Sequence, residues 1–529
     1  MARGDLTDEE WAVLEGLLPS ERGRKARPAH DNRRFLNGML HVLRVGCPWR
    51  DMHERYGKWN SVYVRFRRWA EQGVWDALLE TLVDLGLTDA VFLGLRDNRA
   101  IRSAFLQRVA QKFDLRVAED QFTPKLMLSG RSLMGRNQDD RYRTSEVAPT
   151  TTMLSELGTR FSLSWTNRLN QADRTGRYQS NGLTFSIIQP LLRDAGPEVT
   201  TAPVRLARLG EQANRLSLKS TVSQTVTQIA VAYRELLRAQ EQLRIARDAL
   251  ARSQQLMEVN KALIAAGRMA EFEIVQTEAD AATQELGVEE AANNLDASRR
   301  GLLRLLAFDL NTPVRASDVL EAKRVDLNVV QALRVALENQ PEYLMQLISS
   351  EQAAINLLVA KNQRLWDVSL IGGASQLRDR VLGDQSSNPD RQWDKYAGIQ
   401  LNIPIGDLRP RQNEIRAEVD VKDKAIRLAE MKQLTERDVG DAVRDVGTRW
   451  RQYEIAQRAR ELSRRKLEIE RDKLKVGRSS NFQVLSFETD LRNAENAQLN
   501  ALIAYLNAQT LLDEKLGMTL ESWDIALND

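Results

Sequence analysis

The sequence has one cysteine and three histidines, and these shortages exclude several classes of site. Cys47 has no second cysteine with which to form a disulfide within the chain or a structural zinc site. His30, His41 and His53 lie eleven and twelve residues apart, which is not a metal-ligand spacing. Glycine-rich phosphate loops and a catalytic constellation are also missing. We therefore expect no enzyme activity, no cofactor and no metal.

Long apolar runs are also missing. No stretch of the 529 residues approaches the roughly 18 to 20 consecutive apolar residues that a membrane-spanning helix needs, whereas short alternating strands can still cross a bilayer. The start, MARGDLTDEEWAVLEGLL, has acidic residues where a secretory signal needs a basic region and then an apolar run. No export signal is therefore visible, and retention in the cytoplasm follows as one expectation.

The composition that is present is uneven along the chain. Hydrophobic residues make up 42% and charged residues 28%, as in globular proteins. Between Arg22 and Arg68, however, thirteen Arg or Lys stand against three acidic residues, and five of the ten tryptophans precede residue 90. Two different compositions have been joined. We expect domains at 1–90, 91–312 and 313–529.

The first ninety residues are expected to form a small all-α domain of the helix-turn-helix kind. A capping box of Thr7 and Glu10 begins a helix that runs through Leu18, and further helices follow at about 31–44 and 60–72.

The helix at 60–72 has one apolar face. Val62, Phe66 and Trp69 recur at i, i+4 and i+7 and should point inward. The side chains left for solvent or for DNA phosphate are Arg65, Arg67 and Arg68. A solvated face and a DNA contact are about equally expected from such a run alone.

The order of residues in this segment favours DNA. LTDEEW at 6–11, followed by LNGMLHVLRVGCPWRDMHERYGKWNSVYVRFRRWAEQGVW at 36–75, closely resembles the N-terminal DNA-binding domain of DDE-type insertion-sequence transposases. In that family a catalytic domain follows, whose carboxylates hold two divalent metals. Here the resemblance covers about residues 6–87 and stops near Asp89. It therefore implies a DNA-binding transposase fragment without a catalytic domain.

The rest of the chain contains an internal repeat. AAGRMAEFEIVQTEAD at 265–280 matches KVGRSSNFQVLSFETD at 475–490 with an offset of 210, and LRVAEDQ at 115–121 matches LLVAKNQ at 357–363 with an offset of 242. The first copy should therefore carry extra loop residues between its two matched blocks.

Each copy has a helix, then alternating strands, then a very long helical hairpin. Apolar residues at spacings of four and three predict a coiled-coil seam, formed by Val222, Val226, Ile229, Tyr233, Leu236 and Leu243. Alternation predicts strands at 125–132, 159–166, 183–189, 368–375 and 397–403. Hairpins alone would indicate a structural coiled-coil protein, and the strands disfavour that reading.

Over residues 91–529 the sequence resembles the TolC family of outer-membrane efflux proteins. The resemblance is carried by VFLGLRDNRAIRSA, FTPKLMLSG, LTFSIIQPLLRDAG and VAYRELLRAQEQL, by IQLNIPIGDLRPRQNEIRAE in the second copy, and by the repeated hairpin motif. It implies a mainly α fold with a minor β part. Such proteins are homotrimers that conduct passively: each protomer gives four strands to one shared β-barrel in outer-membrane lipid and long helices to a periplasmic tunnel, and a periplasmic adaptor links this duct to an inner-membrane pump.

The glycines of the repeated motif are expected at the two hairpin turns, where a residue without Cβ can close a helix C-terminus. The resemblance implies that these turns meet the adaptor. The contact candidates are Gly267, Arg268, Met269 and Ala270, and Gly477, Arg478, Ser479 and Ser480.

A departure from the family concerns the tunnel constriction. Well-known members carry paired aspartates just after the second turn, whereas this chain has Gln483 and Ser486, and its acids Glu488 and Asp490 lie further along the helix. Gln483 and Ser486 are our constriction candidates, and no cation-binding acidic ring is expected.

The leading hypothesis is an outer-membrane channel subunit of a tripartite efflux or type I secretion system. By resemblance it belongs in the cell outer membrane and periplasm, and the segment that replaces the signal peptide would make it non-functional if it blocks export. The alternative is a DNA-binding protein that acts through residues 6–87.

Overall fold

The computed structural model describes residues 11, 32–45, 49–71, 84–136, 140–174, 176–382 and 390–527. These residues form mainly α-helices and one large antiparallel sheet, as predicted. They fall into two compact units: Met1–Leu106, Ser217–Glu342 and Lys432–Asp529 in the first, and Gln107–Leu216 and Tyr343–Met431 in the second.

The N-terminal segment contains two of the predicted helices. They are α2 (Asn32–Val45) and α3 (Trp59–Glu71), and the short 3₁₀ turns Trp49–Asp51 and Glu54–Tyr56 lie between them. Their shared core consists of Leu36, Met39, Val42, Met52, Tyr56, Val62 and Trp69, with Phe66 packed against it. The predicted inward face of the second helix is therefore confirmed. Of the helix expected at 7–18, only Trp11 is among the described residues, and it is helical.

The predicted repeat appears as two matching series of helices. The first series is α5 (Leu87–Asp97), α6 (Arg99–Glu119), α8 (Ala202–Ala265) and α9 (Glu273–Leu306). Its counterparts are α10 (Val329–Asn339), α11 (Pro341–Gln363), α12 (Arg409–Lys475) and α13 (Asn481–Leu516). The long members have 64 and 67 residues. Short elements complete the chain, namely η3 (Asp120–Phe122), α7 (Pro197–Thr200), α14 (Thr519–Ser522), and the parallel pair β1 (Asp84–Leu85) and β6 (Arg315–Ala316).

The predicted seam of the first long helix lies in a hydrophobic core. All six seam residues are buried, and Tyr233 is fully enclosed. Its hydroxyl donates a hydrogen bond of 2.7 Å to the carbonyl of Leu85, which satisfies a polar group that would otherwise be costly to bury. Among the described residues, none of the helices has an apolar stretch long enough to cross a bilayer.

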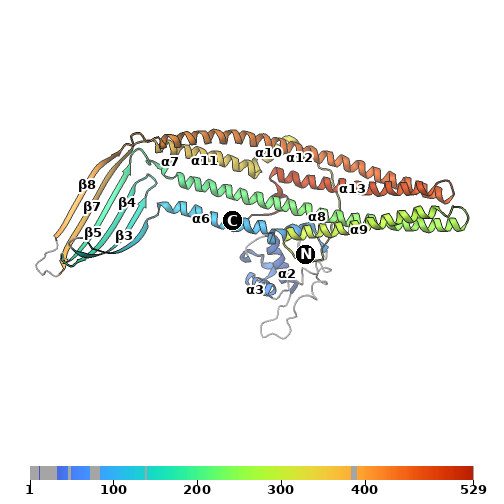
Figure 1. The fold of residues 1–529 in the computed structure, drawn as a ribbon, viewed down its shortest axis with the longest axis horizontal. Helices are drawn as coiled ribbons and strands as arrows, with labels where there is room; N and C mark the ends of the chain where they lie inside the picture. The colour runs from blue at the N-terminus through green and yellow to red at the C-terminus, as the bar shows by residue number, and fades with distance from the viewer. Residues whose placement is uncertain are drawn as a thin grey trace, which may run out of the picture. The chain divides into compact units, whose positions relative to one another are not determined.

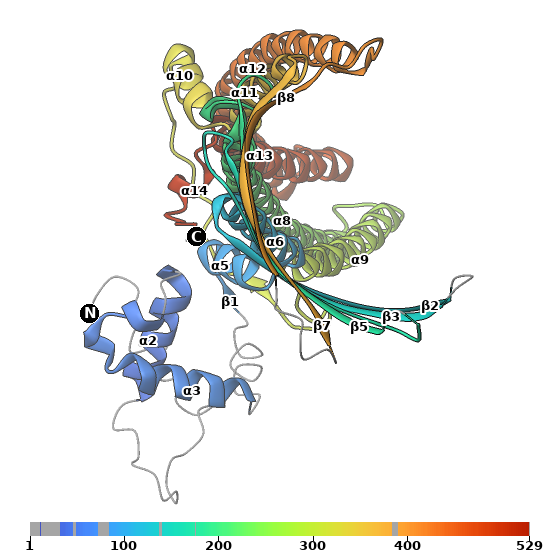
Figure 2. The same cartoon turned by 90° about the vertical axis from the view of Figure 1, so that its left-hand side faces the viewer.

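The sheet has six strands, and Figure 1 shows them side by side. They are β2 (Lys125–Arg136), β3 (Arg141–Leu154), β4 (Arg160–Ala172), β5 (Gly176–Pro190), β7 (Asp367–Leu382) and β8 (Asp390–Asn402). Their spatial order is β2-β3-β4-β5-β7-β8, and every neighbouring pair is antiparallel. Figure 2 shows the sheet as a curved layer.

Two expectations about this sheet were wrong. The first copy does carry extra residues, 242 − 210 = 32 of them, but they form the strand hairpin 141–172 of β3 and β4 and not a loop. The four strands that the family resemblance implied are consequently six.

The turn of the inserted hairpin is anchored beside the start of α7. Thr159 is buried, and its hydroxyl bonds the side chain of Gln189. Gly196 N–H donates to the carbonyl of Leu157. Gly158 has φ +91°, and a Cβ there would lie 2.5 Å from the carbonyl oxygen of Asp194. These contacts, together with pairing along both strands, make the hairpin an integral part of the sheet.

Candidate functional site

The sheet has two chemically different faces. Successive residues of a strand point to opposite faces, and register partners on neighbouring strands share a face. Trp165 pairs with Leu183, Leu183 with Gln376, and Gln376 with Trp393, so these four side chains lie in one row on one face.

We call this the apolar face. Its exposed hydrophobic residues include Leu126, Leu128 and Met134 on β2, Val147 and Met153 on β3, Leu163 and Trp165 on β4, Leu183 and Phe185 on β5, Leu370 on β7, and Trp393, Ile399 and Leu401 on β8. Soluble monomers rarely expose an apolar patch that extends across a whole sheet. This surface therefore requires a covering partner or an apolar medium.

The opposite side, called here the hydroxyl face, carries mostly hydroxyl, amide and charged side chains. Its hydroxyl residues include Thr150, Thr152, Ser162, Ser164, Thr166, Thr184, Ser186 and Ser375. Glu146 and Arg168 form a 2.8 Å ion pair on it. Such a surface is compatible with water.

Both long hairpins turn with the same backbone geometry. Gly267 and Gly477 have φ of +65° and +75°. The next residue in each turn donates its N–H to the carbonyl five residues before it, as Arg268 does to Leu263 and Arg478 to Lys473. This is the Schellman motif, which needs a left-handed residue and so favours glycine. The repeat thus ends both helices, α8 and α12, in the same way.

The two turns lie close together at one end of the helical hairpins (Figure 1). A Cβ on Gly477 would lie 3.9 Å from a guanidinium nitrogen of Arg268. Met269 packs against a buried cluster formed by Leu256, Leu467, Leu474, Val484, Leu485 and Leu491. Ala270 is exposed. Among the eight candidates for adaptor contact, Met269 therefore also packs in the hydrophobic core.

Ser479 and Ser480 of the second turn have local structural roles. The Ser480 side chain caps α13 by accepting a hydrogen bond from the N–H of Gln483. The Ser479 hydroxyl donates to a carboxylate oxygen of Glu470 at 2.6 Å. This bond, and a second one from Lys473, hold the pKa of Glu470 below its ordinary value.

A buried polar layer lies just beside the turns. Asn260 donates to Thr277 at 2.7 Å and to Asn481 at 2.9 Å, and Asn481 donates to Thr277 at 3.0 Å. All three side chains are essentially inaccessible to solvent. Because they come from α8, α9 and α13, the layer fixes the register of one hairpin on the other.

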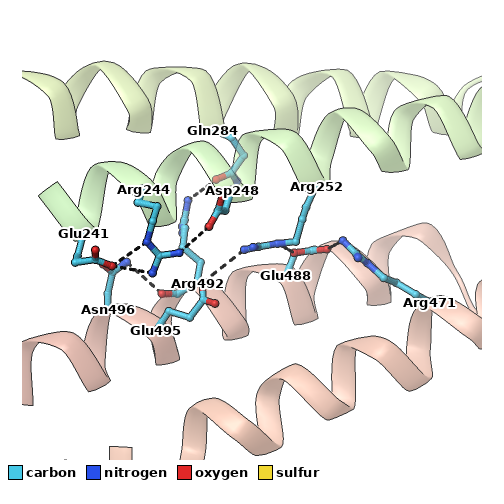
Figure 3. Close-up of polar contacts among 10 residues, drawn as sticks. All are labelled: Glu241, Arg244, Asp248, Arg252, Gln284, Arg471, Glu488, Arg492, Glu495 and Asn496. Atoms are coloured by element: carbon cyan, nitrogen blue, oxygen red, sulfur yellow. Dashed lines mark hydrogen bonds and ion pairs between the residues drawn. The ribbon is translucent and has the colours of Figure 1, made fainter. Parts of the chain in front are cut away.

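The acids that follow the second turn are neutralised by nearby cations of the same chain. Glu488 accepts from Arg252 of α8 at 2.9 Å and pairs with Arg471 of α12 on its other side (Figure 3). Asp490 pairs with Lys466 at 3.0 Å. Gln483 and Ser486 are half-buried on α13.

The network in Figure 3 extends along both hairpins. Glu495 lies 3.7 Å from Arg252, and Arg492 of α13 donates to Gln284 of α9 at 2.8 Å. Charged hydrogen bonds therefore link all four long helices in this region.

We predict that Glu488→Gln destabilises this junction by about 2 kcal/mol, because two arginines that share a nearly buried carboxylate would lose their counter-charge. Thermal unfolding of the full chain measures the effect. The matched control is Glu468→Gln, which removes an exposed partner of Arg464 and should have almost no effect. Equal effects of the two changes would contradict the prediction.

The three N-terminal arginines lie in different environments. Arg65 is half-buried: its guanidinium donates to the side chain of Asn32 at 2.8 Å and lies 4.6 Å from the ring of Phe35. Arg67 and Arg68 are exposed on the same helix. Arg65 is therefore partly engaged within the domain, and Arg67 and Arg68 are the more exposed of the three DNA-contact candidates.

Solved structures share the fold of the larger part of the chain. The Campylobacter jejuni CmeC outer membrane channel matches with a TM-score of 0.63 and 17% identity, over 82% of this chain and 86% of that one. The outer membrane protein VceC of Vibrio cholerae matches with a TM-score of 0.61 and 15% identity, over 82% and 96%. The larger part of the chain has the TolC fold. The predicted fold class is thereby confirmed.

The N-terminal part matches a different group. Residues 6–79 match the family described as "Putative transposase of IS4/5 family". A Sinorhizobium fredii protein described as "Uncharacterized protein y4sN" is 39% identical over 77 residues, and an "Insertion element IS402 uncharacterized 16.2 kDa protein" of Burkholderia cepacia is 38% identical over 89 residues. These matches cover 15% and 16% of this chain, which spans about 60% of the length of either relative. The predicted resemblance to transposases is confirmed for this part.

Two features of the TolC-like region were not predicted. The polar layer of Asn260, Thr277 and Asn481 unites residues as much as 221 positions apart, and one isolated Asn or Thr in a long helix carries no sequence signal. The second feature is the division of the sheet into an apolar and a hydroxyl face. The sequence predicts it only for strands in which apolar and polar residues alternate strictly.

Proposed function

We propose that the TolC-like region is an outer-membrane channel subunit, a passive export duct of a tripartite efflux or type I secretion system. The observation that carries this proposal is the sheet, which has one face rich in exposed hydrophobic residues opposite a face that is mostly polar. Lipid would cover the apolar face, and water with the transported solute would fill the side lined by hydroxyl groups.

The edges of the sheet support assembly of several copies. Within the described part of the chain, β2 and β8 each pair on one side only, and unpaired strand edges cannot be left in lipid. The six strands alternate in direction, so the two edges run oppositely, and β8 of one copy can pair antiparallel with β2 of the next. Such a head-to-tail contact forms a closed ring when the rotation from one copy to the next closes. In the proposed homotrimer, three copies of six strands close into eighteen.

The hairpin turns are the proposed contacts with a periplasmic adaptor, through which an inner-membrane pump would supply energy. Arg268 and Arg478 are the two cations of the turns, and both turns are held in one backbone geometry. Gln483 and Ser486 remain the proposed constriction residues. Uncharged groups there, with Glu488 and Asp490 already paired, favour a constriction that does not depend on a bound cation.

Cell fractionation tests this function. We expect the full chain with a C-terminal tag to be found in the outer-membrane fraction, as a species that runs at three times the monomer mass and dissociates on heating. Recovery only from the cytoplasm, as a monomer, would overturn the proposal.

A second candidate function is DNA binding by the N-terminal domain. It is favoured by the match of residues 6–79 to insertion-element proteins and by the exposure of Arg67 and Arg68 on α3. Phosphate contacts would orient the domain on a duplex.

The salt dependence of DNA binding distinguishes the contribution of Arg68 from that of Arg65. We predict that Arg68→Gln weakens DNA binding by the full chain and lowers the slope of log affinity against log salt by about 1, the effect of one lost phosphate contact. Arg65→Gln should leave that slope unchanged, because its guanidinium is bound to Asn32. Fluorescence anisotropy of a labelled duplex over a salt series measures both. A slope that responds to Arg65 and not to Arg68 would contradict the assignment.

A further inference from the structure

Arginines gather at one end of the apolar face, where the strands lie furthest from the helices (Figure 1). They are Arg136 on β2, Arg141 and Arg143 on β3, Arg177 on β5, Arg378 and Arg380 on β7, and Arg391 on β8. The strand register places them on one face. Arg143 and Arg177 are both partners of Gln171. Arg177 also pairs with Leu382, and Leu382 points to the same side of β7 as the other even-numbered residues, Arg378 and Arg380. We call this set the arginine belt.

Two pairs within the belt are direct cross-strand neighbours of like charge. Arg136 lies opposite Arg141, and Arg378 lies opposite Arg391. Like charges in that position destabilise a sheet. All belt side chains are exposed, and none forms an ion pair with a described residue. Glu146, Asp367, Asp379 and Asp394 of the same strands alternate onto the hydroxyl face.

The belt is continuous with the apolar face. On β8, Trp393 follows Arg391 by two residues, and on β2, Met134 precedes Arg136 by two, so each pair shares a side. Both hydrophobic residues are strongly exposed. On β2 the face thus passes from Met134 directly to the guanidinium group of Arg136, and on β8 Lys395, Trp393 and Arg391 follow the apolar residues Leu401, Ile399 and Ala397. Hydrocarbon-suited side chains followed by cations is the order of chemistry from a bilayer core to its headgroups.

Guanidinium groups bind phosphate through two parallel N–H···O bonds, and closely spaced arginines tolerate one another when an anion lies between them. We infer that the arginine belt binds the phosphate groups of anionic lipids that surround the strand ends, an inference that rests on the proposed membrane function. The bound phosphates offset the repulsion within the two like-charge pairs. They also fix the depth of the sheet in the bilayer.

Tryptophan quenching tests the belt at Arg378 and Arg391. Trp393 is the register partner of Gln376 and lies beside this pair, so lipids with brominated acyl chains that bind there should quench its fluorescence. The full chain is placed in nanodiscs of phosphatidylcholine that contain brominated phosphatidylglycerol or brominated phosphatidylcholine. Trp393→Phe identifies the signal of this residue.

We expect the anionic lipid to quench Trp393 at a lower fraction than the zwitterionic lipid. Arg378→Gln with Arg391→Gln should reduce that preference by roughly fivefold for each arginine removed. Arg131→Gln with Arg168→Gln removes the same charge from the hydroxyl face and should leave the preference intact.

The possible outcomes test lipid binding by the arginine belt separately from the proposed membrane function on which that inference rests. Equal quenching by both lipids in the unmodified chain, or equal loss of preference in the two double variants, overturns the inference and leaves the membrane-facing sheet in place. Quenching by neither lipid means that Trp393 does not face hydrocarbon, and it overturns both.

Discussion

Replacing Leu163 with arginine is expected to abolish assembly in the membrane, whereas arginine at the neighbouring Ser164 is expected to be tolerated. Leu163 lies on the apolar face of β4 with 45% of its surface exposed, and Ser164 lies on the hydroxyl face. An arginine on the lipid side of a membrane strand costs about 2–4 kcal/mol near the bilayer centre. In a closed assembly of three copies that cost applies three times. At Ser164 the same charge remains in water.

The measurement is the yield of the heat-dissociable species in the outer-membrane fraction. Both variants gain one arginine, and the two substituted positions are adjacent in the sequence. A general effect of the new arginine on protein synthesis would therefore reduce the yield of both variants equally. Loss of assembly in both variants, or in Ser164→Arg alone, would show that the two faces have been assigned wrongly.

Deleting residues 141–172 is expected to narrow the closed sheet to about two thirds of its diameter. The deletion removes β3 and β4 and leaves four strands in each copy, and barrel diameter grows roughly in proportion to strand number. The register allows the ends to rejoin. Arg136 lies opposite Arg141, and Ala172 lies opposite Gly176, so β2 ends at nearly the level where β5 begins. Removing an even number of strands also preserves antiparallel order.

End-on electron microscopy of the purified assemblies measures this change. Heat-dissociable migration as three copies serves as the control that the shortened chain still assembles. An unchanged diameter in a trimer of the deletion variant would mean that the inserted hairpin lies outside the closed sheet.

Most of the fold could be predicted because its signals are local and repeated. Val222, Val226 and Ile229 follow the coiled-coil period, and all three are buried. Gly267 and Gly477 stand at equivalent places of the two copies, and both take the left-handed conformation that a turn requires. A repeat provides two independent observations of each element, which makes such patterns reliable.

Strand β3 was missed for a physical reason. Its run from Arg141 to Leu154 places Thr150, Thr151 and Thr152 in succession and has Pro149 at its middle, so no apolar alternation marks it. The strand exists because β2 and β4 pair with it on either side. Of its 32-residue hairpin, the sequence showed the difference between repeat offsets and one strand, predicted at 159–166, which corresponds to β4.

The candidate site residues also differ in how far the sequence predicts their structural role. Turn residues follow from a motif, whereas the partners of Glu488 do not: Arg252 is 236 positions away and reaches it only after two hairpins have packed together. Arg65 was grouped with Arg67 and Arg68 because the three are adjacent on one helix. Its contact with Asn32 depends on how α2 crosses α3.

Cross-linking of the two sheet edges tests the central claim most directly. Cys47 is replaced by serine, and single cysteines are introduced at Leu128 on β2 and Ile399 on β8, both on the apolar face. A short bis-maleimide is then added to membranes that contain the full chain. Edge-to-edge closure of three copies predicts covalent dimers and trimers with no larger product, and no cross-linking when either cysteine is omitted. A ladder that continues beyond three copies, or the absence of any cross-link in assembled membranes, would contradict a closed trimeric duct.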